Sequence, residues 1–295
     1  MNKVDKYEQR IHDIFPELSI ENISLHDEGL DNDIIKVNQE LIFRFPKHEQ
    51  AVKKLEREVK ILKLIKNYIT LNVPNIFYEH HQVIGYFMMC GTSLKKDILP
   101  ELDEQKLNSV VKQLATFLKE LHNVPKDKIL EFDLPESTVN SKFEDWVYLY
   151  ERLQEKVLPE LSESKLTDAK KNFVSFLDNK SNFEYEPKII HGNLGSYHIL
   201  FDKKKKRISG IIDFGTAGLG DPAIDLAALI YSYGEDFVSK FYQYYPELES
   251  YSNRAKFYIE TFKLRWTLSG VTNKEMEWLL SNLGSAKDIN LPNNT

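Results

Sequence analysis

Residues 189–202 read IIHGNLGSYHILFD and place a loop of polar groups between two apolar runs. Further along, residues 211–215 read IIDFG, so that the carboxylate of Asp213 stands at the end of an apolar strand, just before a glycine that lets the chain turn. The run DPAIDLA follows at 221–227, and Asp221 or a neighbour is expected to open a helix. A strand-end aspartate beside a loop of histidine and amide groups suits magnesium-nucleotide chemistry, because hard oxygen ligands hold Mg²⁺ and the metal neutralises phosphate charge.

The chain around this segment changes character at about Cys90. Residues 1–90 alternate strand-like runs with turn signals, whereas residues 91–295 are mostly helical in pattern around a strand-rich island at Lys188–Asp213. An isolated Asp-Phe-Gly is more often a turn than a metal site, but the ordered motifs with a β-rich part upstream are much more specific. The elements predicted in the first part are a hairpin of Ile34–Val37 and Leu41–Phe45, a helix over Ala51–Ile65, and strands at Ile76–Phe77 and Val83–Met89.

Helices dominate the predictions for the second part. Asp103 is expected to cap a helix that carries Leu107, Leu114 and Leu121 on one apolar face. The basic run Lys203–Arg207 joins two strand-like segments and predicts a solvated hairpin tip. The other predicted helices are Ser141–Leu161, Lys165–Leu177 and most segments beyond Pro222.

The composition excludes several classes of protein. The 295 residues carry 39 basic and 45 acidic side chains, a formal net charge of −6, and 42% are hydrophobic, which is the balance of a globular protein. The acidic balance argues against a dedicated nucleic-acid binder. The single cysteine, Cys90, excludes an internal disulfide and a Cys-rich zinc module, and no apolar run approaches the roughly 18–20 residues of a bilayer span. We therefore expect a soluble, cytoplasmic monomer with neither nucleic-acid nor membrane partners.

Taken together, the motifs resemble those of the aminoglycoside phosphotransferase family, including its macrolide phosphotransferase relatives. The family pattern is His-Gly-Asp with an Asn or His five residues beyond that Asp, then Ile-Asp-Phe/Trp, then Asp-Pro-x-x-Asp. The resemblance covers nearly the whole chain and implies a bilobal, protein-kinase-like α+β fold, with a small β-rich nucleotide-binding lobe over 1–90 and a larger, mostly helical catalytic and substrate-binding lobe over 91–295. The matching residues are His191, Gly192, His198, Asp213, Asp221, Pro222 and Asp225.

The resemblance also implies an activity and a role for each matching side chain. The γ-phosphate of ATP or GTP would pass, with Mg²⁺, to a hydroxyl of an aminoglycoside or macrolide antibiotic. Asp213 would bind Mg²⁺, and His198 would occupy the second metal-side position, where a neutral imidazole can ligate the metal or orient a ligating water; a merely buried, hydrogen-bonded histidine is the alternative. His191 would buttress the catalytic loop, and Asp225 would hold that loop by accepting backbone N–H bonds.

Position 193 departs from the family pattern, because Asn193 stands where the family has its catalytic Asp. That Asp accepts or orients the proton of the attacking hydroxyl. A carboxamide can still hydrogen-bond the hydroxyl but cannot take its proton, so we expect impaired transfer with the fold intact. An engineered substitution, a naturally inactivated copy, and a tolerated variant in which positioning dominates all stay open as explanations.

A kinase needs a cation that binds the phosphates of the nucleotide and a helix carboxylate that positions this cation. Both are expected within residues 1–90. Arg44, on the predicted strand Leu41–Phe45, stands where protein kinases carry a lysine. Glu58 follows Leu55 by three residues and precedes Leu62 by four, which places it on the apolar face of its helix. An ionised Glu there needs a partner, and Arg44 is the obvious one. The alternative is a Glu at the edge of an amphipathic face.

The purine and the phosphates have further candidate contacts. Gly29 would form the phosphate-covering turn, although a lone glycine is a weak signal for a nucleotide loop. Residues 85–91 would form the hinge between the lobes, whose backbone groups would contact the purine while Phe87, Met88 and Met89 supply apolar contact. Core strand packing is the alternative for these side chains, and the choice between adenine and guanine is left open.

The acceptor is expected to be a small alcohol of the antibiotic type. The residues after Asp213 lack extra acids that some aminoglycoside-modifying relatives carry, and the run 221–227 favours the macrolide branch slightly. Two other functions stay open. One is a nucleotide-binding pseudokinase, which Asn193 favours, and the other is a kinase for a metabolite such as choline, a sugar or an amino acid.

Overall fold

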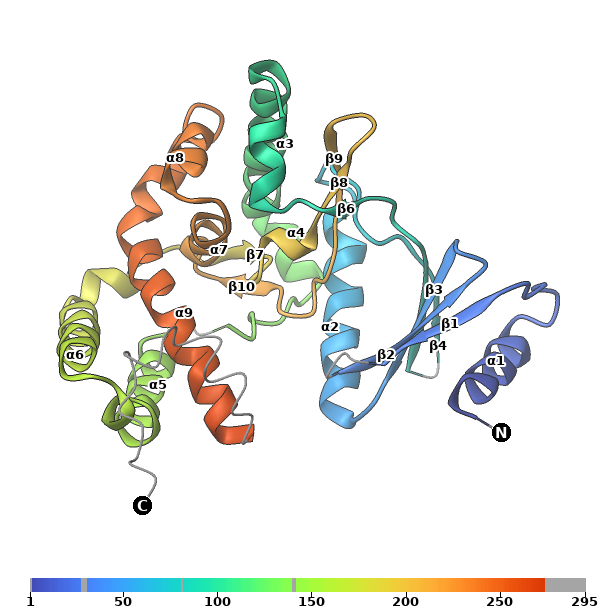
Figure 1. Cartoon of the computed structure of the whole chain (residues 1–295), viewed down its shortest axis with the longest axis horizontal. Helices are drawn as coiled ribbons and strands as arrows, with labels where there is room; N and C mark the ends of the chain where they lie inside the picture. The colour runs from blue at the N-terminus through green and yellow to red at the C-terminus, as the bar shows by residue number, and fades with distance from the viewer. Residues whose placement is uncertain (1, 28–30, 81, 140–141, 274–295) are drawn as a thin grey trace.

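The computed structural model describes residues 2–27, 31–80, 82–139 and 142–273, and it joins an N-terminal β-sheet to a larger helical part (Figure 1). Within these ranges, five strands form one antiparallel sheet in the order β1-β2-β3-β5-β4. Gly29 and its neighbours 28 and 30 lie outside the described residues. The strands are β1 (Ile23–His26), β2 (Asn32–Val37), β3 (Leu41–Pro46), β4 (Ile76–His80) and β5 (Val83–Phe87).

The predicted hairpin and strands of the first part are confirmed, although β4 continues beyond Phe77 to His80 and β5 is shorter than predicted. β2 and β3 pair as expected, but β5 ends at Phe87 rather than Met89. Its partner β3 begins at Leu41, so the Met88 N–H donates to the Glu40 carbonyl at 2.6 Å and no strand residue remains opposite Met89. The strand therefore gives way to an extended connection at the position predicted for the hinge.

Helices cover both faces of the sheet. On one face, α1 (Lys3–Ile14) buries Ile11 against Phe43 and Phe45. On the other, α2 (Glu49–Ile65) packs Leu55 and Val59 against β5. The second half of α2 enters the large core of the helical part through the buried side chains of Ile61, Leu62, Leu64 and Ile65.

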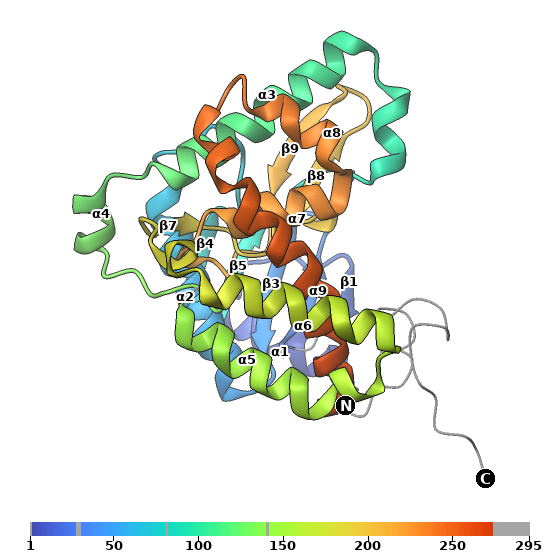
Figure 2. The same cartoon turned by 90° about the vertical axis from the view of Figure 1, so that its left-hand side faces the viewer.

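The helical part surrounds two small antiparallel sheets, β7–β10 and β6–β8–β9. Figure 2 shows α5, α6 and α9 gathered side by side, in agreement with their contacts. The strands are β6 (Thr92–Ser93), β7 (Lys188–Ile190), β8 (Ile199–Asp202), β9 (Arg207–Ile211) and β10 (Gly218–Gly220). The helices are α3 (Glu104–His122), α4 (Lys126–Glu131), α5 (Phe143–Lys156), α6 (Glu163–Asp178), α7 (Ala223–Tyr233), α8 (Glu235–Val238) and α9 (Ser252–Asn273), and the 3₁₀ turns are Lys96–Glu101, Leu158–Glu160, Lys180–Phe183, Ser196–His198, Ser239–Phe241 and Pro246–Tyr251.

Most predicted helices of this part are confirmed. Asp103 caps α3 by accepting the Lys106 N–H at 2.8 Å. The helix predicted to reach Leu161 ends at Lys156, because Pro159 has no N–H to continue it and a 3₁₀ turn follows. Residues 203–206 form the exposed turn between β8 and β9, as the basic run predicted. Across the described ranges, no helix has the length and apolar character that a membrane crossing requires.

Candidate active site

The loop between β7 and β8 is anchored by a buried carboxylate of α7. Asp225, in the first turn of α7, is fully buried and accepts the backbone N–H groups of His191 at 2.9 Å and Gly192 at 2.8 Å. Gly192 has φ +78°, a conformation that favours glycine. These bonds hold the backbone on the N-terminal side of Asn193 in one geometry.

A second buried side chain, His122 at the end of α3, supports Asp225. Its Nε2 lies 3.1 Å from Asp225 Oδ2, and the Tyr245 hydroxyl lies 3.4 Å from its Nδ1. No motif in the sequence marks His122, although it follows Leu118 by four residues and so shares the apolar face of the helix. A histidine on a buried helix face needs a polar partner, which is the signal that could have identified it.

The Asp225 anchor yields a stability prediction. Asp225→Ala is expected to lower the free energy of unfolding by about 3 kcal/mol or more, because buried donors left without an acceptor cost about 1–3 kcal/mol each. Urea denaturation measures the change, with the exposed Asp168→Ala as the matched control. A loss below about 1 kcal/mol, the net value of an ordinary hydrogen bond, would show that the loop does not depend on this carboxylate.

His191 connects the loop to the strand that leads to Asp213. Its Nδ1 lies 3.3 Å from the Asn193 backbone nitrogen and its Nε2 lies 3.0 Å from the Ile212 carbonyl. Burial lowers the pKa of this imidazole, so the neutral ring accepts from the first group and donates to the second. His191 therefore holds the backbone of Asn193 close to the residue before Asp213.

His198 bridges the same two positions from the other side. Its Nδ1 lies 2.7 Å from the Asn193 carbonyl and its Nε2 lies 3.2 Å from Asp213 Oδ2. Burial acts to lower the pKa of His198, but the hydrogen bond to Asp213, the charge of Asp213 and the contact with the Asn193 carbonyl together outweigh burial and raise that pKa. The same bond lowers the pKa of Asp213 against the opposing effect of burial, so Asp213 is held as a carboxylate.

Asp213 stands in a strained and accessible position. Its φ of +67° is in the left-handed region, which costs a non-glycine residue about 1–3 kcal/mol and is often found at functional sites. Its side chain is half exposed. The Asn193 side chain is also exposed and forms no hydrogen bond with the described residues. The histidines thus bring Asn193 and Asp213 together while leaving both side chains accessible.

Arg44 and Glu58 form the expected ion pair. The Arg44 Nη1 to Glu58 Oε2 distance is 2.7 Å, and both side chains are largely buried, at 13% and 1% exposure. Burial acts to lower the pKa of Arg44, but the Glu58 charge raises it. Burial raises the pKa of Glu58, and both the Arg44 charge and the Phe214 backbone act to lower it, so Glu58 of α2 also interacts with the residue after Asp213. Arg44 Nε is buried and has no hydrogen-bond partner in the described part of the chain, so it can serve a ligand oxygen.

Comparison with known proteins decides the family. A model described as "Phosphotransferase enzyme family" matches residues 22–258, which include the sheet, the loop between β7 and β8 and most of the helical part. The chain belongs to this phosphotransferase family.

Several characterised proteins are similar to this phosphotransferase. Viomycin phosphotransferase of Streptomyces vinaceus is 29% identical over 154 residues, which are 51% of this chain and 50% of that protein, so the match spans half the length of this relative. A solved GDP and kanamycin complex of APH(2")-IIia is 26% identical, with a TM-score of 0.84 over 94% of this chain and 95% of the other. A solved macrolide 2'-phosphotransferase type I, 19% identical with a TM-score of 0.75 over 95% and 97% of the two chains, shares the fold.

Residues 85–91, which are predicted to form the hinge, place their apolar side chains in different directions. Tyr86 lies on the α2 face of the sheet and interacts with Arg44. Phe87 points to the opposite face, where its ring centroid lies 5.1 Å from that of Phe77. The Met88 N–H is occupied by Glu40, and the Met89 methyl lies against Gly210 of β9. Of the apolar residues in this segment, Tyr86, which the sequence analysis did not select, is the one beside the Arg44–Glu58 pair.

At this site a metal ion would be bound by one carboxylate, that of Asp213. Among the described residues, no group of three or more His, Cys, Asp or Glu side chains could hold a metal ion. Asp213 Oδ2 is engaged by His198. Mg²⁺ keeps several waters and binds through one or two carboxylates together with substrate phosphates, so Asp213 beside a nucleotide suits this ion.

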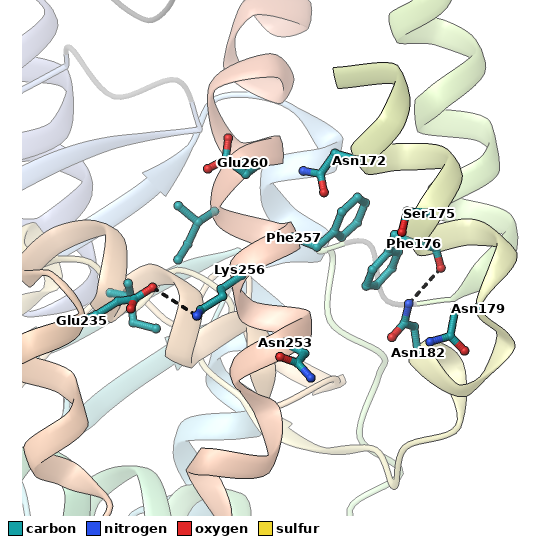
Figure 3. A pocket seen from close by; sticks show the side chains of 12 residues that line it. Asn172, Ser175, Phe176, Asn179, Asn182, Glu235, Asn253, Lys256, Phe257 and Glu260 are labelled. Atoms are coloured by element: carbon teal, nitrogen blue, oxygen red, sulfur yellow. Dashed lines mark hydrogen bonds and ion pairs between the residues drawn. The ribbon is translucent and has the colours of Figure 1, made fainter. Parts of the chain in front are cut away.

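A polar cavity of about 540 Å³ lies between α6, α8 and α9 (Figure 3). Phe176 and Phe257 stack at 3.6 Å between ring centroids on one side of it. Glu235 lies on the opposite side, where its carboxylate is 3.7 Å from the Lys256 Nζ (Figure 3). The polar lining includes Asn172, Ser175, Asn179, Asn182, Asn253, Glu235, Lys256 and Glu260.

Proposed function

We propose that this chain is an antibiotic O-phosphotransferase, which transfers the γ-phosphate of ATP or GTP to a hydroxyl of its acceptor. The observation that carries the proposal is the pair of histidine bridges that brings Asn193 and Asp213 together beside the Arg44–Glu58 pair. A phosphoryl-transfer site needs a cation, a metal-binding carboxylate and an acceptor-positioning residue in one cleft. Membership of the phosphotransferase family supports the same assignment.

The nucleotide would bind between the sheet and the catalytic loop. The unpaired Arg44 Nε would donate to a phosphate oxygen while Glu58 fixes the guanidinium. Tyr86 would stand at the back of the purine site, and the GDP bound to the kanamycin-binding relative favours GTP over ATP. Asp213 would hold Mg²⁺, which supplies charge neutralisation on the phosphates when bound. His198 would orient the Asp213 carboxylate rather than ligate the metal, because both of its ring nitrogens are already engaged.

Arg44 provides a direct test of nucleotide binding. Arg44→Gln is expected to weaken Mg-GTP binding at least about 10-fold, since a charge-assisted hydrogen bond contributes about 1.5–3 kcal/mol. Isothermal titration calorimetry measures the affinity for Mg-GTP. Arg44→Lys keeps the charge but loses the planar fork of the guanidinium, so its affinity is expected to lie between those of the unaltered chain and of Arg44→Gln. Arg10, which stacks on Phe45 on the other face of the sheet, gives the matched control Arg10→Gln. Unchanged affinity in a folded Arg44→Gln protein would remove Arg44 from the site.

The acceptor is best assigned to the aminoglycoside class. Carboxylates at Glu235, which is paired with Lys256, and at Glu260 line the cavity between α6, α8 and α9 together with several carboxamides, and such groups pair with the amines and hydroxyls of a polyamine sugar. The kanamycin complex is also more similar to this chain than the macrolide enzyme is. These observations favour an aminoglycoside over the macrolide that the run 221–227 favoured.

Two other functions predict different results in one assay. The chain and its Asn193→Asp form are incubated with Mg-GTP or Mg-ATP and a panel of possible acceptors, and products are detected by mass spectrometry. The panel contains aminoglycosides, viomycin, macrolides, choline, sugars and amino acids. Phosphorylation of an aminoglycoside is expected. Transfer only to a metabolite would identify a metabolite kinase. Nucleotide-dependent thermal stabilisation with no product in either form would identify a pseudokinase.

A further inference from the structure

The connection between α2 and β4 crosses to the helical part of the molecule, although it precedes the hinge in sequence. The Thr70 backbone nitrogen and Oγ1 donate to Glu120 of α3 at 2.8 and 3.1 Å. The partly buried side chains of Tyr68, Leu71 and Val73 pack against the large core that already contains the end of α2. The helix that carries Glu58 is therefore attached to the helical part at its C-terminal end.

Asn72 makes the attachment specific by pairing with the edge of β9. Its carbonyl accepts the Ile211 N–H at 2.9 Å, and its Nδ2 donates to the Ser209 carbonyl at 3.0 Å. β9 is the edge strand of its sheet, with β8 on its other side. A single residue thus satisfies a donor and an acceptor of that edge, as a short neighbouring strand would.

Gly210 lies between the two residues that Asn72 contacts, and the structure leaves no space for a side chain there. A Cβ at this position would lie 2.8 Å from the Asn72 carbonyl oxygen and 2.0 Å from the Met89 terminal methyl. The methionine end is flexible and could move, but the Asn72 oxygen belongs to the backbone. Any side chain at 210 must therefore displace the loop from β9.

Both sides of this contact lead directly to the candidate active site. On one side, α2 carries Glu58, which binds Arg44 and the Phe214 backbone. On the other side, β9 ends at Ile211, two residues before Asp213. A cavity of about 690 Å³ borders Asn72, Met89 and Ser209, so the contact has no dense packing behind it on that side.

We propose that Asn72 and Gly210 form a fixed joint that sets the spacing between the Arg44–Glu58 pair and Asp213, and that both are positioning residues for nucleotide binding. The nucleotide part rests on the proposed function. The joint keeps α2 in its active position without any ligand, because the helix is held through its C-terminal connection rather than by the nucleotide. Displacing the loop by the width of a methyl group would separate the groups that contact phosphate from the carboxylate that holds Mg²⁺.

The joint is tested with two variants and a matched control. Gly210→Ala displaces the Asn72 carbonyl. Asn72→Ala removes only the exposed hydrogen bond to the Ser209 carbonyl. This second variant tests the joint even if Gly210→Ala does not fold. Asn75→Ala changes an exposed asparagine of the same loop that has no role in the joint. Each is made in a Cys90→Ser background with Lys53→Cys on α2 and Lys112→Cys on α3, both exposed positions that take spin labels.

Two readouts are compared: the distance distribution between the labels and the affinity for Mg-GTP. We expect Gly210→Ala to shift or broaden the distances and raise Kd at least about 10-fold, and Asn72→Ala to raise it about 3-fold, since small misplacements at such sites have large effects. Asn75→Ala should change neither. Unchanged distances, or changed distances with unchanged Kd, would overturn the proposal. If the parent chain binds neither Mg-GTP nor Mg-ATP, the proposed function fails, and the label distances alone decide whether the joint exists.

Discussion

Asp213→Asn is expected to lower kcat for phosphate transfer by at least about 10³-fold when it is made in the Asn193→Asp form. The metal that Asp213 would hold contributes several kcal/mol of charge stabilisation, and each 1.36 kcal/mol changes a rate tenfold. The amide keeps the shape of the side chain but removes the negative charge. His198 then loses its charged partner, so its raised pKa should return toward the ordinary value.

Steady-state kinetics with Mg-GTP measure the effect, and the dependence on Mg²⁺ concentration identifies its cause. Asp202, which ends the neighbouring strand β8 and caps its hairpin turn, provides the matched control Asp202→Asn, with an expected change of less than about 2-fold because its exposed bonds contribute little. A fall of less than 10-fold, or an unchanged Mg²⁺ dependence, would contradict the assignment of Asp213 as the metal-binding carboxylate.

Asn193→Asp is expected to raise kcat by about 10²–10⁴-fold, the usual contribution of a general base. Asn193 is exposed, and its backbone nitrogen and carbonyl are fixed by His191 and His198, so the substitution changes the side-chain chemistry and leaves the loop geometry in place. A carboxylate can take the proton of the attacking hydroxyl, whereas the carboxamide can only orient it. The effect should therefore lie in kcat rather than in the Kd for nucleotide.

Asn67→Asp, at an exposed position in the connection after α2, adds the same charge away from the site and is expected to leave kcat unchanged. Equal turnover of the two residue-193 forms would remove the base assignment. In that case positioning of the hydroxyl and stabilisation of the phosphates would account for all of the rate.

The elements and the centre of the site could be predicted because their signals are local. Alternating apolar residues predicted the hairpin β2–β3, and the position of Glu58 on an apolar helix face predicted its pairing with Arg44. The direction of Tyr86 was also accessible in principle. It pairs with Ile42 in register, and side chains two residues apart on a strand share a face, so Ile84, Tyr86 and Arg44 had to lie together.

Contacts between distant parts of the chain that no motif marks could not be predicted. His122 reaches Asp225 from another helix, and the Met89 methyl lies against Gly210 of β9. The amides and carboxylates of the cavity come from separate helices whose packing follows from shape complementarity between many side chains. No local pattern reports such packing, so this cavity and the contact of Asn72 with β9 could be found only in the structure.

The most direct test of the central claim is phosphate transfer by the Asn193→Asp form from Mg-GTP to kanamycin, followed by mass spectrometry beside the unaltered chain. We predict a kanamycin that carries one phosphate, formed slowly by the unaltered chain and much faster by the variant. Neither form should make this product when Mg²⁺ is removed. An Asn193→Asp form that binds Mg-GTP yet transfers no phosphate to kanamycin or to any other antibiotic would contradict the account.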